Sequence, residues 1–217
     1  MVIGGQNGSG KTTLCRHLNG LLNPTSGEVL LNGESIQKDI RKTRQTVGMV
    51  FQNADMQIVG ETVYSDISFG PENLSLPRDE INNRVDAAIN DVGLTALRDH
   101  KPHTLSGGEK RKLAIAGILV MLPRVIIFDE PFSNLDYPGS RQVLKQIINL
   151  HRTGHTIIII THELEKVIAQ ADRLVVMQRG RIVQSGSPAG IIMDVEQYGI
   201  RMPCSVKLGK GVVSWLD

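Results

Sequence analysis

A segment near the start of the chain has the residue types and spacing of a phosphate-binding loop. Residues 5–12 fit the pattern G-x-x-x-x-G-K-[ST] at every fixed position. Glycines let the backbone wrap a phosphate with its N–H groups pointing inward, and the helix that follows directs its positive end to the same place. A glycine-rich turn that only caps a helix would leave Lys11 and Thr12 unexplained. We predict nucleotide contacts from Gly5, Gln6, Asn7, Gly8, Ser9, Gly10, Lys11, Thr12 and Thr13, with Lys11 on the β- and γ-phosphates and Thr12 on Mg²⁺.

Two adjacent carboxylates follow a short apolar run in the second half of the chain. The run Val125–Phe128 leads directly into Asp129 and Glu130. Ligands of open α/β sheets bind beyond the carboxyl ends of the strands, so both side chains are expected beside the phosphate loop. Asp129 is predicted to hold the magnesium shell, and Glu130 to orient or deprotonate an attacking water. Many strands end in a solvated acid, so this prediction depends on the phosphate loop upstream.

Two more polar residues follow predicted strands at the same edge. His162 comes after the apolar run 156–160, one β-α-β crossover beyond Glu130, and is expected next to it, within reach of a γ-phosphate. Gln52 follows the run 47–51, and its amide is predicted to contact Mg²⁺ or the attacking water. Elsewhere, such residues would be interpreted as ordinary surface or turn residues.

A third segment, at residues 105–109, precedes a very apolar helix. Its residues Ser106 and Glu109 match the S-x-x-E pattern of a capping box, which explains the helix start without a ligand. Residues 110–112, however, are all cations in the first turn, where the helix dipole disfavours them. We interpret Ser106, Gly107, Gly108 and Glu109 as a second anion site that serves the ATP of another subunit.

The elements that position these residues follow from the hydrophobic pattern. Strands are predicted at 47–51, 125–128, 156–160 and 174–177, and helices at 11–22, 79–92, 109–122, 139–151 and 163–171. A hairpin is predicted at 175–184. From residue 125 strands and helices alternate, which indicates an α/β fold with a mainly parallel sheet, whereas residues 55–122 have the pattern of consecutive helices.

Composition narrows the function. A chain of 217 residues with 41% hydrophobic residues suits one domain. The net charge of +2 gives no footprint for nucleic acid, so we expect no nucleic-acid partner. No apolar run approaches the roughly 18 residues that would span a bilayer. Cys15 and Cys204 lack metal spacing, which fits a reducing cytosol.

The motifs together resemble those of the nucleotide-binding domains of the ATP-binding-cassette (ABC) transporter family, in order over nearly the whole chain. Gln52 matches the glutamine loop and Leu105–Glu109 the signature, with Glu109 where Gln is commoner. Asp129-Glu130 matches the acidic pair, Ser133–Asp136 the loop after it, and His162 the switch histidine. The Asn-Lys-x-Asp element of GTPases is absent from the sequence.

The resemblance implies an ATPase that uses ATP and Mg²⁺ on a P-loop NTPase fold. It implies one domain over 1–217, with a RecA-like core at 1–54 and 123–190, a helical subdomain at about 55–122 and a C-terminal tail at 191–217. Two subunits would pack head to tail, each ATP lying between one phosphate loop and the partner's signature, with Asp136 helping to join the halves. A transmembrane partner at the cytoplasmic face of the membrane is also implied.

A narrower resemblance rests on the segments 51–57, 62–73 and 198–203. They are similar to those of the ATPases of energy-coupling-factor importers, which take up vitamins and transition metals such as cobalt. The alternatives are the ATPase of another ABC transporter class and a truncated, non-hydrolysing relative that acts as an interaction partner. A soluble cassette protein working on DNA or the ribosome would usually need a second cassette or a coiled-coil insertion.

One departure from the family concerns the start of the chain. The family carries upstream strands and an aromatic residue that stacks on adenine, whereas only Met1–Ile3 precede the loop here. We therefore expect an N-terminally truncated cassette with weak ATP binding and poor solubility.

Overall fold

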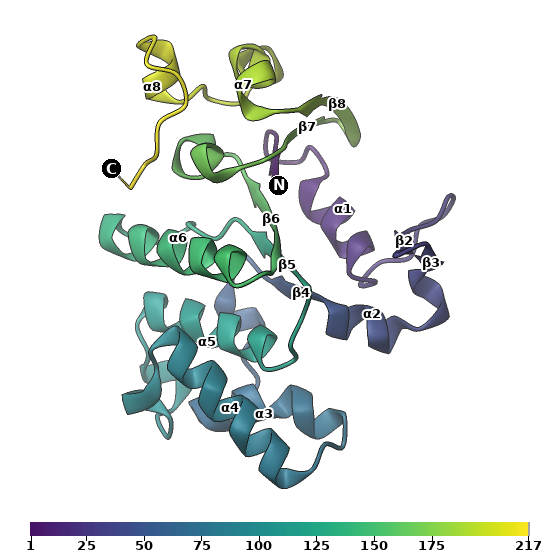
Figure 1. Ribbon diagram of the computed structural model, residues 1–217, viewed down its shortest axis with the longest axis vertical. Helices are drawn as coiled ribbons and strands as arrows, with labels where there is room; N and C mark the ends of the chain where they lie inside the picture. The colour runs from purple at the N-terminus through teal and green to yellow at the C-terminus, as the bar shows by residue number, and fades with distance from the viewer. Residues whose placement is uncertain (217) are drawn as a thin grey trace.

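The computed structural model describes residues 1–216, whose largest element is a six-stranded sheet in the order β4-β5-β6-β1-β7-β8 (Figure 1). All neighbours are parallel except β7 and β8. The strands are β1 (Val2–Gly4), β4 (Val47–Val50), β5 (Val125–Asp129), β6 (Thr156–Thr161), β7 (Leu174–Gln178) and β8 (Arg181–Gly186). β1 pairs with β6 on one side and β7 on the other, which places the start of the phosphate loop inside the sheet.

Side chains of alternating positions enter two cores, one on each face of this sheet. Ile127 and Ile160 pack with Cys15 of α1 (Lys11–Leu18) on one face. Ile126 and Phe128 pack on the other face, in the core that includes buried residues of α6 (Tyr137–Arg152). Strands of a parallel sheet covered on both faces are expected to be apolar throughout, which explains the continuous Val and Ile runs.

Three helices form a unit at one end of the sheet, at the bottom of Figure 1. They are α3 (Val63–Asn73), α4 (Arg78–Val92) and α5 (Gly107–Leu119), and each contacts the other two. Their buried side chains belong to the same apolar cluster as the α6 face of the sheet. The sheet and the helical unit therefore share a continuous core, and α5 of this unit contacts β4.

Short elements complete the chain. They are β2 (Leu30–Leu31), β3 (Glu34–Ser35), α2 (Ile40–Thr46), α7 (Pro188–Ile191), α8 (Cys204–Lys207), and the 3₁₀ turns η1 (Ile36–Lys38), η2 (Ala54–Met56), η3 (Thr95–Leu97), η4 (Pro102–Thr104), η5 (Leu164–Lys166), η6 (Ile168–Gln170) and η7 (Ile192–Tyr198). The tail folds back on α6: the Trp215 ring contacts Tyr137 edge-on, and Arg141 donates to the carbonyl of Leu216 at 2.9 Å.

The four predicted strands, the terminal hairpin and three of the predicted helices are confirmed within a few residues. The helix predicted at 11–22 ends at Leu18, close to Gly20, whose φ of 69° is left-handed. The helix predicted at 163–171 is wrong: the segment forms η5 and η6, because Val167 between them has a φ of −125°. Among the described residues, none of the helices has the length and apolar composition needed to cross a membrane.

Candidate nucleotide-binding site

The phosphate loop joins β1 to α1 in a conformation that requires its glycines. Gly8 and Gly10 have φ angles of 80° and 97°, in the region that side chains disfavour. A Cβ on Gly5 would lie 2.5 Å from both the carbonyl oxygen of Met177 and the Oγ of Ser9. The loop can therefore adopt this conformation only with glycine at these positions. In this conformation its backbone N–H groups can surround a phosphate.

Lys11 begins α1 and is nearly fully buried, with 6% of its surface exposed. Its Nζ donates to the carbonyls of Gly5 at 2.8 Å and Gln6 at 2.9 Å. Burial lowers the Lys11 pKa, while Glu130 and Asp129 act in the opposite direction. Two of the three ammonium donors thus hold the loop, and the third is the one a phosphate oxygen would take.

Two of the three residues predicted to bind magnesium, Thr12 and Asp129, lie in direct contact. Thr12 Oγ1 donates to Asp129 Oδ1 at 3.1 Å, although the two are far apart in sequence. Asp129 ends β5 and is buried; burial raises its pKa, and the hydrogen bond from Thr12 partly opposes that shift. A hydroxyl and a carboxylate are the oxygen ligands that Mg²⁺ prefers, so the donor set fits this ion. The Oγ of Ser9 nearby is buried and has no hydrogen-bond partner among the described residues, which suits a loop built to meet polar atoms.

Glu130 has a strained backbone conformation, and both its backbone and its carboxylate are hydrogen-bonded. Its φ of 44° is left-handed, which costs a non-glycine residue about 1–3 kcal/mol. Its N–H donates to Ile160 at 2.9 Å, and its carbonyl accepts from the Ser133 N–H at 3.1 Å and hydroxyl at 2.9 Å. Its carboxylate contacts Nδ1 of His162 at 2.9 Å through Oε1 and accepts from the Thr161 hydroxyl at 3.1 Å through Oε2. The surrounding contacts therefore fix both the backbone and the carboxylate.

These segments line one cleft of about 330 Å³. The structure thus brings together the phosphate loop, Gln52 from the end of β4, Glu130 after β5 and His162 after β6. The cleft is lined by Asn7, Gly8, Gly10, Lys11, Thr12, Thr13, Gln52, Glu130 and His162. It lies at the carboxyl edge of the parallel strands, as their predicted order requires.

The signature residues are not among those that line this cleft. Ser106 and Glu109 form a reciprocal capping box: Ser106 Oγ accepts from the Glu109 N–H at 3.4 Å, and Glu109 Oε2 accepts from the Ser106 N–H at 2.8 Å. Hydrogen bonds from the Ser106 hydroxyl and then its backbone N–H lower the pKa of Glu109. The geometry is that of an exposed helix start outside the chain's own phosphate cleft.

The argument from unmatched cations at residues 110–112 is wrong for two of them. Lys110 forms an ion pair with Asp55 at 2.7 Å. Arg111 donates to the carbonyls of Phe51 at 2.5 Å and Gln52 at 2.7 Å. Partners from the Gln52 loop therefore stabilise these cations, and an external anion is not needed for that purpose. The role of Ser106–Glu109 toward a second ATP stays a prediction.

Asp136 also has a structural partner. Its carboxylate caps α6 by accepting from the Gly139 N–H at 2.9 Å, and the residue is exposed outside the cleft. Sequence reasoning missed Thr161, which precedes the predicted histidine, and the contacts of Arg111. A polar residue ending an apolar strand was the available signal for Thr161, whereas no local pattern identifies the partners of Arg111.

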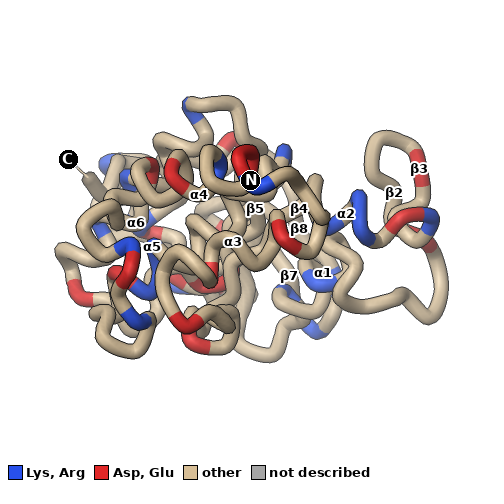
Figure 2. The backbone as a smooth tube through the Cα atoms, turned by 90° about the horizontal axis from the view of Figure 1, so that it is seen from below, with Lys and Arg blue, Asp and Glu red and all other residues tan. Residues whose placement is uncertain are grey.

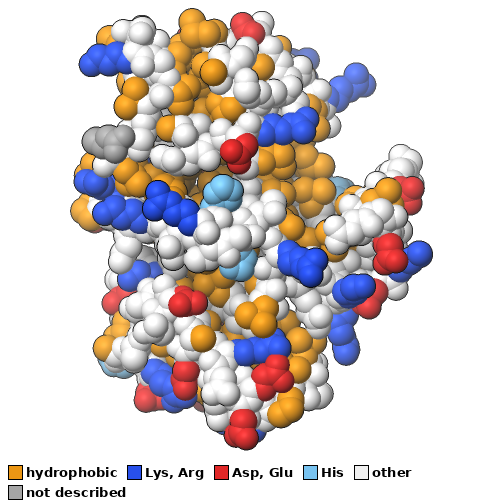
Figure 3. Space-filling view, in the orientation of Figure 1, with side chains coloured by type: hydrophobic (Ala, Val, Ile, Leu, Met, Phe, Trp, Pro, Cys, Tyr) orange, Lys and Arg blue, Asp and Glu red, His pale blue; other side chains and the backbone are white. Residues whose placement is uncertain are grey.

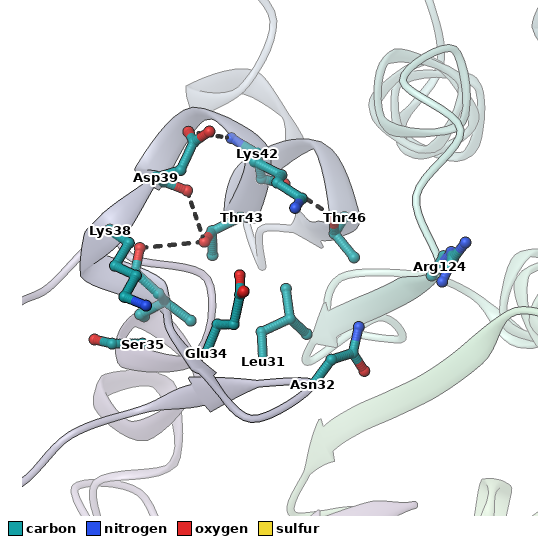
Figure 4. A pocket seen from close by; sticks show the side chains of 11 residues that line it. Leu31, Asn32, Glu34, Ser35, Lys38, Asp39, Lys42, Thr43, Thr46 and Arg124 are labelled. Carbon is teal, nitrogen blue, oxygen red and sulfur yellow. Dashed lines mark hydrogen bonds between the residues drawn. The ribbon is translucent and has the colours of Figure 1, made fainter.

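A larger hollow, of about 520 Å³, lies between the β2–β3 hairpin and α2 (Figure 4). Its polar side chains serve the local fold. Asp39 accepts from the Lys42 N–H at the start of α2, and Thr43 donates to the carbonyls of Ile36 and Asp39. It shares no residue with the phosphate cleft, and we assign the nucleotide chemistry to the smaller cleft.

Charged residues of both signs are interspersed along the backbone (Figure 2). The space-filling view shows the same mixture on one face, with blue and red side chains side by side over the helical unit (Figure 3). This distribution agrees with the small net charge of +2.

Comparisons with known proteins agree with the geometry. The profile of the ABC transporter family matches residues 1–133. The energy-coupling factor transporter ATP-binding protein EcfA of Methanocaldococcus jannaschii is 45% identical over 205 residues, covering 92% of this chain and 74% of that protein. EcfA2 of Symbiobacterium thermophilum is 43% identical over 211 residues, covering 94% and 73%. The solved structure of cbiO1 from Clostridium perfringens, part of the ABC transporter complex cbiONQ, has a TM-score of 0.81 and 39% identity, covering 96% of this chain and 86% of that one.

Proposed function

Because the chain belongs to the ABC transporter family, we propose that it is the ATP-hydrolysing subunit of an energy-coupling-factor importer. The observation that supports this most strongly is the phosphate cleft, in which Lys11, the Thr12–Asp129 pair and the Glu130–His162 pair meet. The similar EcfA proteins are named as ATP-binding proteins of energy-coupling factor transporters, and cbiO1 as part of an ABC transporter complex. The uptake of a vitamin or a transition metal is what the resemblance to energy-coupling-factor importers implies. The site of action would be the cytoplasmic face of the membrane, with the chain attached peripherally.

The residues of the cleft divide the work of phosphoryl transfer to water. Lys11 and the loop N–H groups bind the β- and γ-phosphate oxygens, and Glu130 orients the attacking water and accepts its proton. Thr12, Asp129 and Gln52 would hold Mg²⁺, which when bound neutralises charge on the phosphates. His162 contacts Glu130 through Nδ1, so Nε2 is the nitrogen available to a γ-phosphate oxygen, and both nitrogens donate when the ring is protonated.

A second ATPase subunit would complete the site. Ser106 and Gly107 are exposed at the start of α5, outside their own chain's cleft. Backbone N–H groups at a helix start bind anions, and the ligand proposed for this position is the γ-phosphate of an ATP on another subunit. A head-to-tail pair would therefore join each signature to the partner's phosphate loop, and Asp136, exposed at the start of α6, would help to join the halves. Whether the pair is a homodimer or a heterodimer, the same geometry applies.

The transmembrane partner is proposed to dock beside Gln52, over residues 55–69. Three large apolar side chains there are exposed: Met56 by 78%, Val59 by 65% and Phe69 by 53%. Apolar side chains that lie together on a surface mark protein contacts, and we propose that these three form such a surface. The position next to Gln52 would let docking influence the cleft.

The decisive experiment measures ATP turnover by the purified chain with Mg²⁺ and with excess chelator. Magnesium-dependent turnover that disappears in Lys11→Ala is expected. Wild-type chain that binds ATP without hydrolysing it would instead support the non-hydrolysing alternative. For the importer, the chain is co-expressed with the candidate membrane subunits of an energy-coupling-factor importer. Co-purification that is lost in Met56→Asp and Phe69→Asp, with turnover retained, is expected; complexes unaffected by both changes would place the docking surface elsewhere.

A further inference from the structure

Arg111 is a buried cation at the junction of the signature helix and the Gln52 loop. Only 4% of the residue is exposed, and its Nη1 and Nη2 donate to the successive carbonyls of Phe51 and Gln52 at 2.5 and 2.7 Å. A hollow of about 120 Å³ beside it is lined by residues of three segments: the Gln52 loop, the start of α5 and residues 133–135 after Glu130. Arg111 therefore stands where three predicted functional segments meet.

The guanidinium fork makes a contact that other side chains cannot reproduce. Its planar, divergent N–H groups bond two neighbouring carbonyls at once and fix both peptide planes, whereas a lysine offers one nitrogen. Burial lowers the pKa of Arg111 while Asp129 opposes that shift. Burying a cation is costly because the charge loses its contact with water. The next turn of α5 is filled by apolar side chains such as Leu113 and Ile115. Packing alone would be served better by an apolar residue, so the directed bonds are the property that explains this arginine.

We propose that Arg111 is a positioning residue that transmits the placement of the signature helix to Gln52. The signature residues Ser106–Glu109 lie at the start of α5. Arg111, in the first turns of the same helix, donates a hydrogen bond to the backbone carbonyl of Gln52. Lys110 makes a second link to the same loop through Asp55. When α5 moves, the Gln52 carbonyl moves with it, and so does the amide that lines the phosphate cleft. Engagement of the signature by a partner subunit is thereby coupled to the geometry of the chain's own site.

This inference rests on the proposed function, and a double-mutant cycle tests it. ATP turnover is measured over a range of ATP concentrations for wild type, Arg111→Met, Gln52→Ala and the double variant. Rates are divided by the amount of bound non-hydrolysable ATP analogue, so that unfolded protein does not count. Arg111→Met is expected to lower kcat about tenfold with KM within about twofold, since it disturbs a group used in the reaction more than in binding. In the Gln52→Ala background it should cost less than about twofold more, because residues that act through one another are not additive.

Two further variants keep the test sharp. Arg111→Lys retains the charge but bonds one carbonyl at a time, so its kcat should lie between wild type and Arg111→Met. Arg44 of α2 also donates to a backbone carbonyl, that of Gly20 at 3.0 Å. Arg44→Met should leave kcat unchanged. Multiplicative effects of Arg111→Met and Gln52→Ala, or a KM change as large as the kcat change, would overturn the inference. Failure of the proposed function looks different, since wild type would then show no turnover.

Discussion

The phosphate cleft and the signature segment differ in where their polar side chains find partners. In the cleft, Thr12 meets Asp129 and Glu130 meets Thr161 and His162, pairs separated by 117, 31 and 32 residues. In the signature, Ser106 and Glu109 bond each other across three residues. The first set exists only when the whole sheet is folded. The second forms as soon as one helix begins.

This difference shows which chemistry each region can perform alone. Long-range contacts hold the cleft residues in one geometry, including a strained backbone at Glu130, as expected of groups that must be preorganised. The signature is an exposed helix start whose side chains are already paired, so its backbone N–H groups and glycines are what it would offer to the proposed partner. The cleft is a site within one chain, whereas the role proposed for the signature is half of a site between chains.

The largest effect is expected from Glu130→Gln, which tests whether the cleft contains its own general base. The amide keeps the size and hydrogen-bonding position of the side chain but cannot accept a proton from water. Turnover should fall roughly 10²- to 10⁴-fold, the range that a general base contributes. ATP binding should persist, and the variant should accumulate as an ATP-bound dimer in gel filtration. Wild-type turnover in Glu130→Gln would remove Glu130 from the catalytic role.

A smaller loss is expected for Thr161→Val, which removes a donor to the Glu130 carboxylate and preserves the shape of the side chain. Turnover should fall about tenfold, because a hydrogen bond to a charged group contributes about 1.5–3 kcal/mol. The ATP Kd should stay near its wild-type value, since Thr161 is not among the residues lining the cleft. Thr161→Ser keeps the hydroxyl and serves as the control. Equal kcat values for the Val and Ser variants would show that the hydroxyl does not position Glu130.

A several-fold recovery is expected from mixing two inactive subunits, which tests the signature side of the comparison. Lys11→Ala disables the phosphate loop, and Ser106→Arg blocks the signature. In a head-to-tail pair of the two, one composite site carries both changes and the other carries neither. Turnover of the mixture should exceed that of each variant alone. If mixed dimers form, as a tag-based pull-down can show, and turnover does not rise, the signature does not act across the pair.

The sequence predicted the cleft well because its residues stand at the ends of apolar strands. A buried parallel strand appears as a Val- and Ile-rich run, and polar residues within one or two positions of its end lie at the carboxyl edge. That rule identified Gln52, Asp129, Glu130 and His162, which the structure brings to one edge. Their individual roles stay predictions, which the variants above address.

Other features were not predicted from the sequence, either because the residues that cause them are distant in the chain or because a local signal was overlooked. The carbonyl partners of Arg111 are 60 and 59 residues away, so a cation at a helix start suggested an external anion instead. The β2–β3 hairpin turns at Asn32-Gly33, whose φ angles are 54° and 83°, and Asn-Gly is a strong hairpin signal that could have been used. The segment that follows His162 forms 3₁₀ turns where periodicity suggested a helix. At its start, the Thr161 hydroxyl accepts a hydrogen bond from the Glu163 N–H.

The smallest expected effect is on stability and concerns Asp66 in the proposed docking region. Like the signature residues, Asp66 bonds to groups that are close to it in the sequence. Its Oδ1 accepts from the N–H groups of Val59 at 2.7 Å and Gly60 at 2.8 Å, fixing the segment before α3. Burial raises the pKa of Asp66 above its ordinary 3.8, and the two backbone hydrogen bonds only partly oppose this. The folded chain therefore binds this proton more tightly than the unfolded chain does.

The sign of that shift sets the prediction for Asp66→Asn. With more protons bound in the folded state, stability falls as the pH rises from the ordinary aspartate pKa through the raised value. The asparagine oxygen can accept both backbone bonds and does not ionise, so the variant lacks this loss. The unfolding free energy of Asp66→Asn minus that of wild type should therefore increase across this pH interval and level off above it. Urea titrations at a series of pH values measure the difference. A difference that decreases with rising pH would mean that the fold favours the ionised carboxylate, and that the hydrogen bonds to the 59–60 segment outweigh its burial.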